Sequence, residues 1–274
     1  MKPNLKTMTA ISCGLLAVAL ATGAADAQQL PDDLISAEIL GGWRTETGTQ
    51  MAALHLTLAD GWKTYWRAPG DAGIPPQFDW TGSTNITGVT YHWPRPHVFA
   101  LSGLRTIGYK NDLVLPIEFQ PATVGDPVSV TAQITLGVCQ DVCVPITVDV
   151  SADLSSATKV DPAIRAALDQ APRSARAAGI SLPRCTVAPI SDGLRLTTTI
   201  ALPAAVDGDF VVVELSDNSV WVSSVDTTAA DGALVEVSDL VPSMAKPFSL
   251  DRSSLRYTIF TAKGDVIDVQ GCAG

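Results

Sequence analysis

Residues 137–145 of the chain are Gly137-Val138-Cys139-Gln140-Asp141-Val142-Cys143-Val144-Pro145. Apolar and polar residues alternate on both sides of this segment, over 128–136 and again over 146–150. Alternation with a period of two is typical of half-buried strands, so the pattern predicts a β-hairpin with a short loop between the cysteines. Directly opposed residues have Cα atoms roughly 4.5–5.5 Å apart, a separation that a disulfide accepts. Cys139 and Cys143 are therefore predicted to face each other across the first pair of the hairpin.

Three roles are compatible with this cysteine pair. The loop-entropy estimate gives about 2 kcal/mol for a ring of about five residues, against about 4.6 kcal/mol for one of about 88, so this bridge restrains the unfolded chain little. A bridge at a loop tip is also easy for another thiol to reach, which favours redox exchange. A small structural staple is the second role, and a Cu(I) site is the third because two thiolates suit that ion. The spacing alone leaves all three open.

Residues 1–27 have the pattern of a secretory signal peptide. A positively charged start precedes an apolar core at 11–20, and Ala25-Asp26-Ala27 forms an A-x-A cleavage site, which makes Gln28 the first mature residue. No later apolar run approaches the roughly 18 residues that a membrane span needs. The sequence therefore predicts an exported protein without membrane insertion.

The net charge of the chain excludes some classes of partner, and the number of cysteines indicates an oxidising compartment. The chain has 274 residues with 18 Lys and Arg against 28 Asp and Glu, a net charge of −10, which argues against nucleic acid or anionic lipid as partner. The mature chain keeps four cysteines, and an even number in an exported protein fits two bridges. The second bridge would join Cys185 to Cys272 and is predicted to be structural. His92 and His97 lack the helical spacing of a zinc site, so no metal and no cofactor are predicted.

The rest of the chain predicts an all-β protein of two domains. Eight or nine short strands with turn signals between them suggest an antiparallel sandwich over 28–154. A linker at 155–181 contains a short helix, because Asp161 followed by a proline is an N-cap and first-turn signal. Strand patterns resume over 182–274, which predicts a second, smaller β domain. The segment 94–103, with two prolines, is expected to be a loop that carries Phe99 at its apolar tip.

Several motifs in order resemble one family of redox proteins. They are G-W-K-T-Y-W-R-A-P-G-D-A-G-I-P-P at 61–76, W-P-R-P at 93–96, Gly-Tyr at 108–109 and the cysteine hairpin. This order is similar to that of the N-terminal periplasmic domain of the DsbD and ScsB thiol:disulfide interchange proteins, and it is closer to the ScsB branch. The resemblance covers about residues 34–154 and is weaker over 161–274.

The resemblance implies an immunoglobulin-like sandwich, a periplasmic location and a function in electron relay. The pair that accepts and passes on electrons would be Cys139 and Cys143, with Cys143 as the exchanging sulfur. Phe99 would shield the pair as a cap, and Tyr65 and Trp62 would line the site. The implied partners are a membrane-embedded thiol reductase and periplasmic thioredoxin-like proteins. A Cu(I)-binding protein of copper tolerance and a non-catalytic β-sandwich with two structural disulfides remain the alternatives.

Overall fold

Strands make up most of the described chain. The computed structural model describes residues 33–101, 103–155, 159–217, 219–245 and 248–274, so the predicted signal peptide lies outside the described residues. The elements in chain order are β1 (Ile35–Arg44), β2 (Gln50–Leu58), β3 (Lys63–Gly70), β4 (Gln77–Asp79), β5 (Gly88–Tyr91), β6 (His97–Leu101), β7 (Leu104–Lys110), β8 (Asp112–Gln120), β9 (Ser129–Cys139), β10 (Cys143–Asp153), α1 (Pro162–Asp169), β11 (Arg173–Ser174), α2 (Ala175–Ala178), β12 (Arg184–Pro189), β13 (Leu194–Ala201), β14 (Phe210–Leu215), β15 (Val220–Ala230), β16 (Ala233–Pro242), 3-10 turns at Ser243–Ala245 and Arg252–Ser254, β17 (Leu255–Phe260) and β18 (Val266–Gln270).

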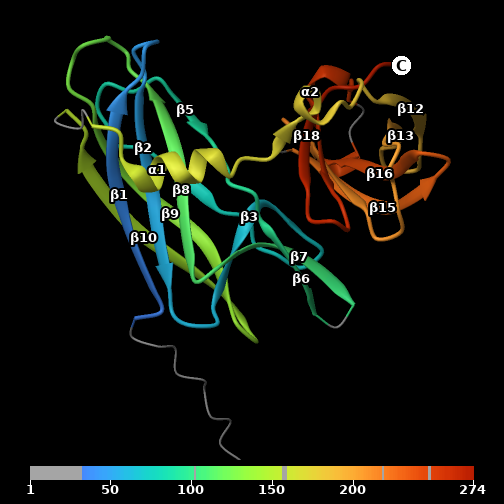
Figure 1. The fold of residues 1–274 in the computed structure, drawn as a ribbon, viewed down its shortest axis with the longest axis horizontal. Helices are drawn as coiled ribbons and strands as arrows, with labels where there is room; N and C mark the ends of the chain where they lie inside the picture. The colour runs from blue at the N-terminus through green and yellow to red at the C-terminus, as the bar shows by residue number, and fades with distance from the viewer. Residues whose placement is uncertain (1–32, 102, 156–158, 218, 246–247) are drawn as a thin grey trace, which may run out of the picture. The chain divides into compact units, whose positions relative to one another are not determined.

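The first ten strands form two antiparallel sheets. One sheet has the order β1-β2-β8-β5, and the other has the order β10-β9-β3-β7-β6, with β4 also paired to β9 (Figure 1). The alternation that predicted the strands also fills the core: Val130, Ile134 and Val138 of β9 are fully buried between the sheets. This arrangement confirms the predicted all-β fold class, an immunoglobulin-like antiparallel sandwich followed by further β structure joined through a short helix.

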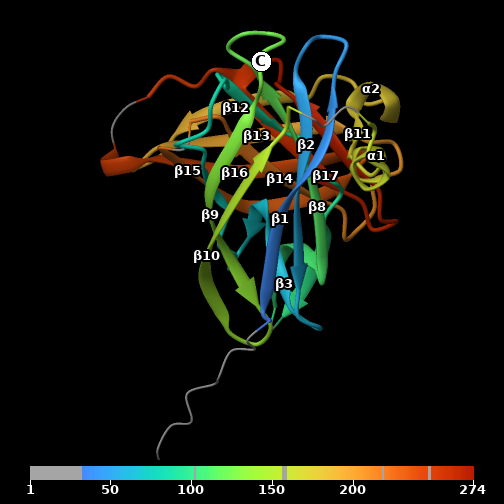
Figure 2. The ribbon, with the colours of Figure 1, turned by 90° about the vertical axis from the view of Figure 1, so that its left-hand side faces the viewer.

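Helix α1 covers the outer face of the first sheet. Asp161 is its N-cap and accepts hydrogen bonds from the amides of Ala163 and Ile164, so the capping signal in the sequence has its expected effect. The Ile164 side chain is fully buried and packs against Met51 and Ala53 of β2. Figure 2 shows the helix beside the strands of this sheet. The helix that the sequence placed in a linker is therefore packed on the sandwich that precedes it.

The C-terminal strands form two further sheets. Their orders are β11-β18-β17-β14 and β12-β13-β16-β15, and their buried side chains form a second apolar core. All pairs between these strands are antiparallel except that of β11 with β18. A disulfide joins Cys185 in β12 to Cys272 after β18, with the Cα atoms 5.8 Å apart.

Side chains of the C-terminal sheets also contact the first sandwich. Arg67 of β3 donates two hydrogen bonds of 3.0 Å to the carboxylate of Glu214, from Nε and from Nη2. Phe210 and Phe260 stack on each other and belong to the core of the first sandwich. Because the two cores meet in this way, the domain boundaries at 155–181 stay a prediction.

One expectation about local structure was wrong. The segment around Phe99 is not an irregular loop: residues 97–101 form strand β6, which pairs with β7 so that Phe99 lies opposite Thr106. The two prolines that suggested a loop lie at 94 and 96, before the strand begins, so neither removes a hydrogen bond from it.

Candidate redox site

The candidate site lies at the tip of the β9–β10 hairpin. The two strands pair without a register shift from Cys143 opposite Cys139 to Asp153 opposite Ser129. Cys139 and Cys143 are joined by a disulfide, and their Cα atoms are 4.2 Å apart. Three residues connect the strands, and the amide of Gln140 donates to the carbonyl of Val142 across this loop. The period-two alternation of the sequence thus brings the two sulfurs together.

The two cysteines differ in their access to solvent. Cys139 is 1% exposed, whereas Cys143 is an exposed residue at the start of β10. A thiol of another molecule therefore reaches the Cys143 side of the bridge first. If the bridge opens by attack at Cys143, the negative charge appears on the buried sulfur of Cys139, and its surroundings decide how stable that thiolate is.

Tyr65 of β3 holds the group nearest to both sulfurs. Its hydroxyl oxygen lies 2.9 Å from Sγ of Cys139 and 2.9 Å from Sγ of Cys143, and its side chain is 2% exposed. Burial raises the pKa of Tyr65 above its usual value of about 10. The phenol consequently stays protonated at neutral pH and can donate a hydrogen bond to either sulfur.

Two glycines make room for the Tyr65 ring. A Cβ atom at Gly137 of β9 would lie 2.9 Å from Cδ2 of Tyr65 and 2.8 Å from Cβ of Ile74. A Cβ atom at Gly73 would likewise lie 2.9 Å from Cδ1 of the same ring. The ring is thus held between strand β9 and the segment that follows β3, and a side chain at either glycine would displace it.

The other residues predicted for the site lie farther from the sulfurs. Trp62 is 8% exposed and belongs to the core between the two sheets. Phe99 is half-buried on β6, where its ring centroid lies 5.2 Å from Nζ of Lys63. No described contact joins Trp62 or Phe99 to Cys139 or Cys143, so their roles as site-lining residue and cap remain predictions.

Lys63 is a residue of the site that the sequence motifs do not single out. This residue precedes Tyr65 by two positions on β3 and lies directly opposite Cys139 of β9 and Lys110 of β7. The cysteine hairpin itself contains no Lys or Arg. The sequence does contain one indication of the position of Lys63. Side chains alternate between the two faces of a strand, so Lys63 and Tyr65, two positions apart, lie on the same face of the sheet.

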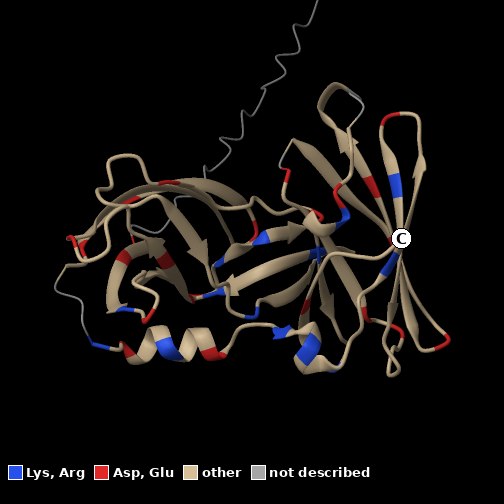
Figure 3. Ribbon diagram, turned by 90° about the horizontal axis from the view of Figure 1, so that it is seen from above, with Lys and Arg blue, Asp and Glu red and all other residues tan. Residues whose placement is uncertain are grey.

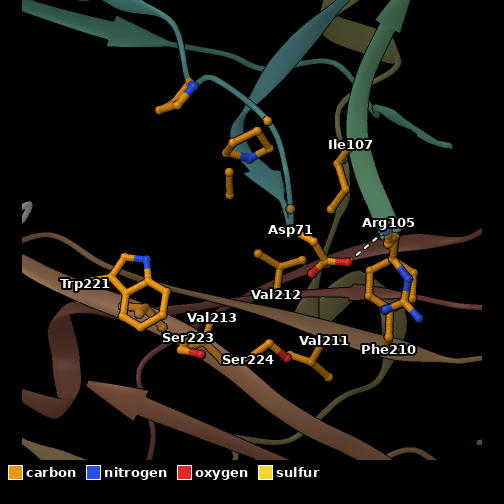
Figure 4. A pocket seen from close by; sticks show the side chains of 16 residues that line it. Asp71, Arg105, Ile107, Phe210, Val211, Val212, Val213, Trp221, Ser223 and Ser224 are labelled. Atoms are coloured by element: carbon orange, nitrogen blue, oxygen red, sulfur yellow. Dashed lines mark hydrogen bonds between the residues drawn. The ribbon is translucent and has the colours of Figure 1, made fainter. Parts of the chain in front are cut away.

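A cavity lies behind the segment that follows β3. Its volume is about 610 Å³, and Figure 4 shows Trp221, Ser223 and Ser224 of β15 along one side of it. On another side the guanidinium of Arg105 stacks on the ring of Phe210, 3.8 Å from its centroid. Gly73 and its neighbours thus separate this cavity from the Tyr65 ring.

Clusters of metal-binding side chains and membrane-spanning helices are both absent from the described residues. Among them, no group of three or more His, Cys, Asp or Glu side chains is arranged to hold a metal ion. Within the same part of the chain, no helix is both long and apolar enough to cross a membrane.

Comparison with known proteins supports the resemblance seen in the sequence. Residues 33–155 match the model of the family described as "Thiol:disulfide interchange protein DsbD, N-terminal". Among solved structures, the fold is similar to that of the N-terminal periplasmic domain of ScsB from Proteus mirabilis, with a TM-score of 0.57 and 22% identity over 88% of this chain and 92% of that chain. No curated protein matches the sequence. The predicted resemblance to the DsbD and ScsB type is thus confirmed for the segment that contains the cysteine hairpin, and at this identity the structural likeness concerns the fold alone.

Proposed function

We propose that the chain is a periplasmic thiol:disulfide interchange protein that relays electrons through Cys139 and Cys143. The observation that carries the proposal is the Tyr65 hydroxyl, which lies 2.9 Å from both sulfurs at the tip of a hairpin with one buried and one exposed cysteine. A structural staple needs no hydrogen-bond donor at its sulfurs, because a disulfide carries no charge. A sulfur that becomes a thiolate does need one.

The relay proceeds by two exchange steps. The thiolate of an upstream partner attacks Sγ of Cys143, a new bond forms between these sulfurs, and the bond between Cys139 and Cys143 breaks with its electron pair on Cys139. The Tyr65 hydroxyl donates to that thiolate. A second thiolate of the partner then attacks the partner's own sulfur in the mixed disulfide, which releases Cys143 and leaves the pair reduced. The reduced pair passes its electrons to a downstream disulfide by the reverse sequence.

The proposed partners follow from the family of this segment. A membrane-embedded thiol reductase would supply the electrons, and thioredoxin-like proteins would receive them. The A-x-A site at 25–27 and the periplasmic origin stated for the similar ScsB structure support export of a mature chain that begins at Gln28. The proposed organisation is a redox domain at 28–154, a linker at 155–181 and a second β domain at 182–274.

A pair of single-cysteine variants tests the mechanism. The Cys139→Ser variant leaves the exposed thiol and is expected to accumulate mixed disulfides with small disulfides and with partner proteins. The Cys143→Ser variant leaves the buried thiol and serves as the matched control, with far slower trapping. Equal trapping rates for the two variants would refute the assigned direction of attack.

The reduction potential of the bridge tests the function itself. An exchanging pair is expected above about −300 mV, whereas inert structural bridges lie below that value. The measurement is equilibration of the whole chain with dithiol buffers of known potential, followed by alkylation and mass mapping of each cysteine. A value below that limit would support the staple, and stoichiometric uptake of Cu(I) by the reduced pair, with no exchange, would support a copper-binding role.

A further inference from the structure

The cysteine pair begins a row of four residues across the second sheet. Cys143 lies opposite Cys139, Cys139 opposite Lys63, and Lys63 opposite Lys110, on the adjacent strands β10, β9, β3 and β7. Residues directly opposite each other project from the same face, with Cβ atoms about 4.5–5.5 Å apart. Two ammonium groups therefore follow the two sulfurs on the outer face of this sheet.

Neither ammonium group of this row has an ion-pair partner in the part of the chain that the structure describes. Among the described residues, no carboxylate lies within ion-pair distance of Lys63 or Lys110. Nζ of Lys63 instead lies 5.2 Å from the centroid of the Phe99 ring, a cation–π contact that holds the charge in place and leaves it unpaired. The opposing charge nearest in sequence to the sulfurs is Asp141, an exposed residue of the loop between the cysteines.

This row is unusual for the chain that carries it. The sequence has ten more acidic than basic residues, and the charges of both signs are spread along the ribbon (Figure 3). A molecule with this balance repels acidic partners at most of its surface. An unpaired pair of lysines beside the disulfide has the opposite effect at the one place where a partner's thiol must arrive.

We infer that Lys63 and Lys110 make this face of the sheet a docking surface for partners whose reactive cysteine is surrounded by negative charge. The inference rests on the proposed function and names the kind of partner that it serves. Complementary charge steers a partner to its site and fixes its orientation, and it acts mainly on the association rate. Lys63 also lies directly opposite Cys139 in the sheet, so its positive charge would favour the thiolate that forms on Cys139 when Cys143 is attacked.

Peptide thiols of different charge test this surface on the whole chain. Three capped pentapeptides carry a central cysteine flanked on each side by two Glu, two Gln or two Lys residues. The rate at which each one reduces the Cys139–Cys143 bridge is divided by its thiolate concentration, which removes differences in ionised fraction, and by its rate with a small neutral disulfide, which removes differences in thiolate nucleophilicity. In the native chain the acidic peptide is expected to react faster than the basic one at low ionic strength, and the difference is expected to shrink at about 1 M salt, where the screening length is about 3 Å.

Three variants test whether the preference for the acidic peptide comes from the charges beside the cysteines. One unit charge at about 6 Å in water changes an interaction enough to alter a rate by about threefold. Lys63→Gln is therefore expected to lower the ratio of acidic to neutral peptide rates by at least about threefold, and Lys63→Arg to restore it. Asp141→Asn, the matched control of opposite sign, should raise the same ratio.

The outcomes separate this inference from the proposed function. If the neutral peptide fails to reduce the bridge of the native chain, the proposed function fails. If it reduces the bridge but Lys63→Gln leaves the ratio unchanged while the variant melts at the native temperature, the docking surface is refuted and Lys63 only packs on Phe99.

Discussion

Replacing Tyr65 by Phe removes one hydroxyl and keeps the ring that fills the space between Gly137 and Gly73. The hydroxyl lies 2.9 Å from each sulfur, and a hydrogen bond to a charged group contributes about 1.5–3 kcal/mol. The full value applies to the Cys139 thiolate of the reduced pair. At about 1.36 kcal/mol per pKa unit, the variant is expected to raise the thiol pKa of Cys139 by about one to two units.

The exchange rate should change by a smaller factor than the equilibrium. The leaving sulfur carries only part of its final charge in the transition state, because the bond between the two sulfurs is not yet fully broken there, and a leaving thiol of lower pKa departs faster. With about half of that charge developed, loss of about 0.75–1.5 kcal/mol of hydrogen-bond energy slows reduction of the bridge about fourfold to twelvefold. Because burial raises the pKa of Tyr65 above about 10, the phenol stays a donor and the effect should be constant from pH 6 to about pH 9.

The assay is the reduction of the bridge by excess dithiothreitol, followed by quenching and mass analysis, together with the pH dependence of alkylation of the reduced pair. Tyr91→Phe is the matched control, because the Tyr91 hydroxyl accepts a hydrogen bond from Trp80 and has no described contact with a sulfur. A Tyr65→Phe rate within twofold of the native rate, with an unchanged thiol pKa, would show that the phenol only fills space.

Three further outcomes concern stability. Replacing Cys185 and Cys272 by Ala should destabilise the C-terminal sheets by up to about 4–5 kcal/mol, measured by thermal unfolding, and leave thiol exchange intact; unchanged melting would contradict this. Arg67→Met should cost about 2–3 kcal/mol in denaturant unfolding, because it leaves the partly buried Glu214 without its bidentate partner; a loss below 1 kcal/mol would contradict it. Burial raises the pKa of Glu236 from 4.5 to about 7, so the folded chain binds this proton more tightly than the unfolded chain. Stability from this group should be greatest below about pH 4.5 and should fall by up to about 3 kcal/mol as the pH rises to about 7; Glu236→Gln should remove that slope, and an unchanged slope would exclude the group.

The alternation of apolar and polar residues predicts most strands of the first sandwich. The strands around the cysteines alternate strictly, and the structure pairs them without a shift from Cys139 to Ser129. The short helix was also predictable, because Asp161 caps it through its own side chain. Both features are determined by residues that are close together in the sequence, so the sequence alone predicts them.

Features that depend on neighbours across strands were not accessible in the same way. The row that brings Lys63 to Cys139 needs the strand order, and the sequence does not state which strands are adjacent. The prolines at 94 and 96 predict a loop, whereas pairing with β7, which no local pattern shows, makes residues 97–101 a strand. The stacking of Arg105 on the ring of Phe210 likewise joins residues more than 100 positions apart, which no local pattern reveals.

The bridge between Cys185 and Cys272 has a mechanical consequence. The separation of 87 residues corresponds to a fully extended span of about 300 Å. If the chain is pulled from its two ends, force passes through the bridge and this span cannot lengthen, so only the segments outside it unravel. After reduction of the bridge, the same force should also unfold and extend the segment between Cys185 and Cys272. Single-molecule extension would thus read out the oxidation state of one disulfide as a step in length.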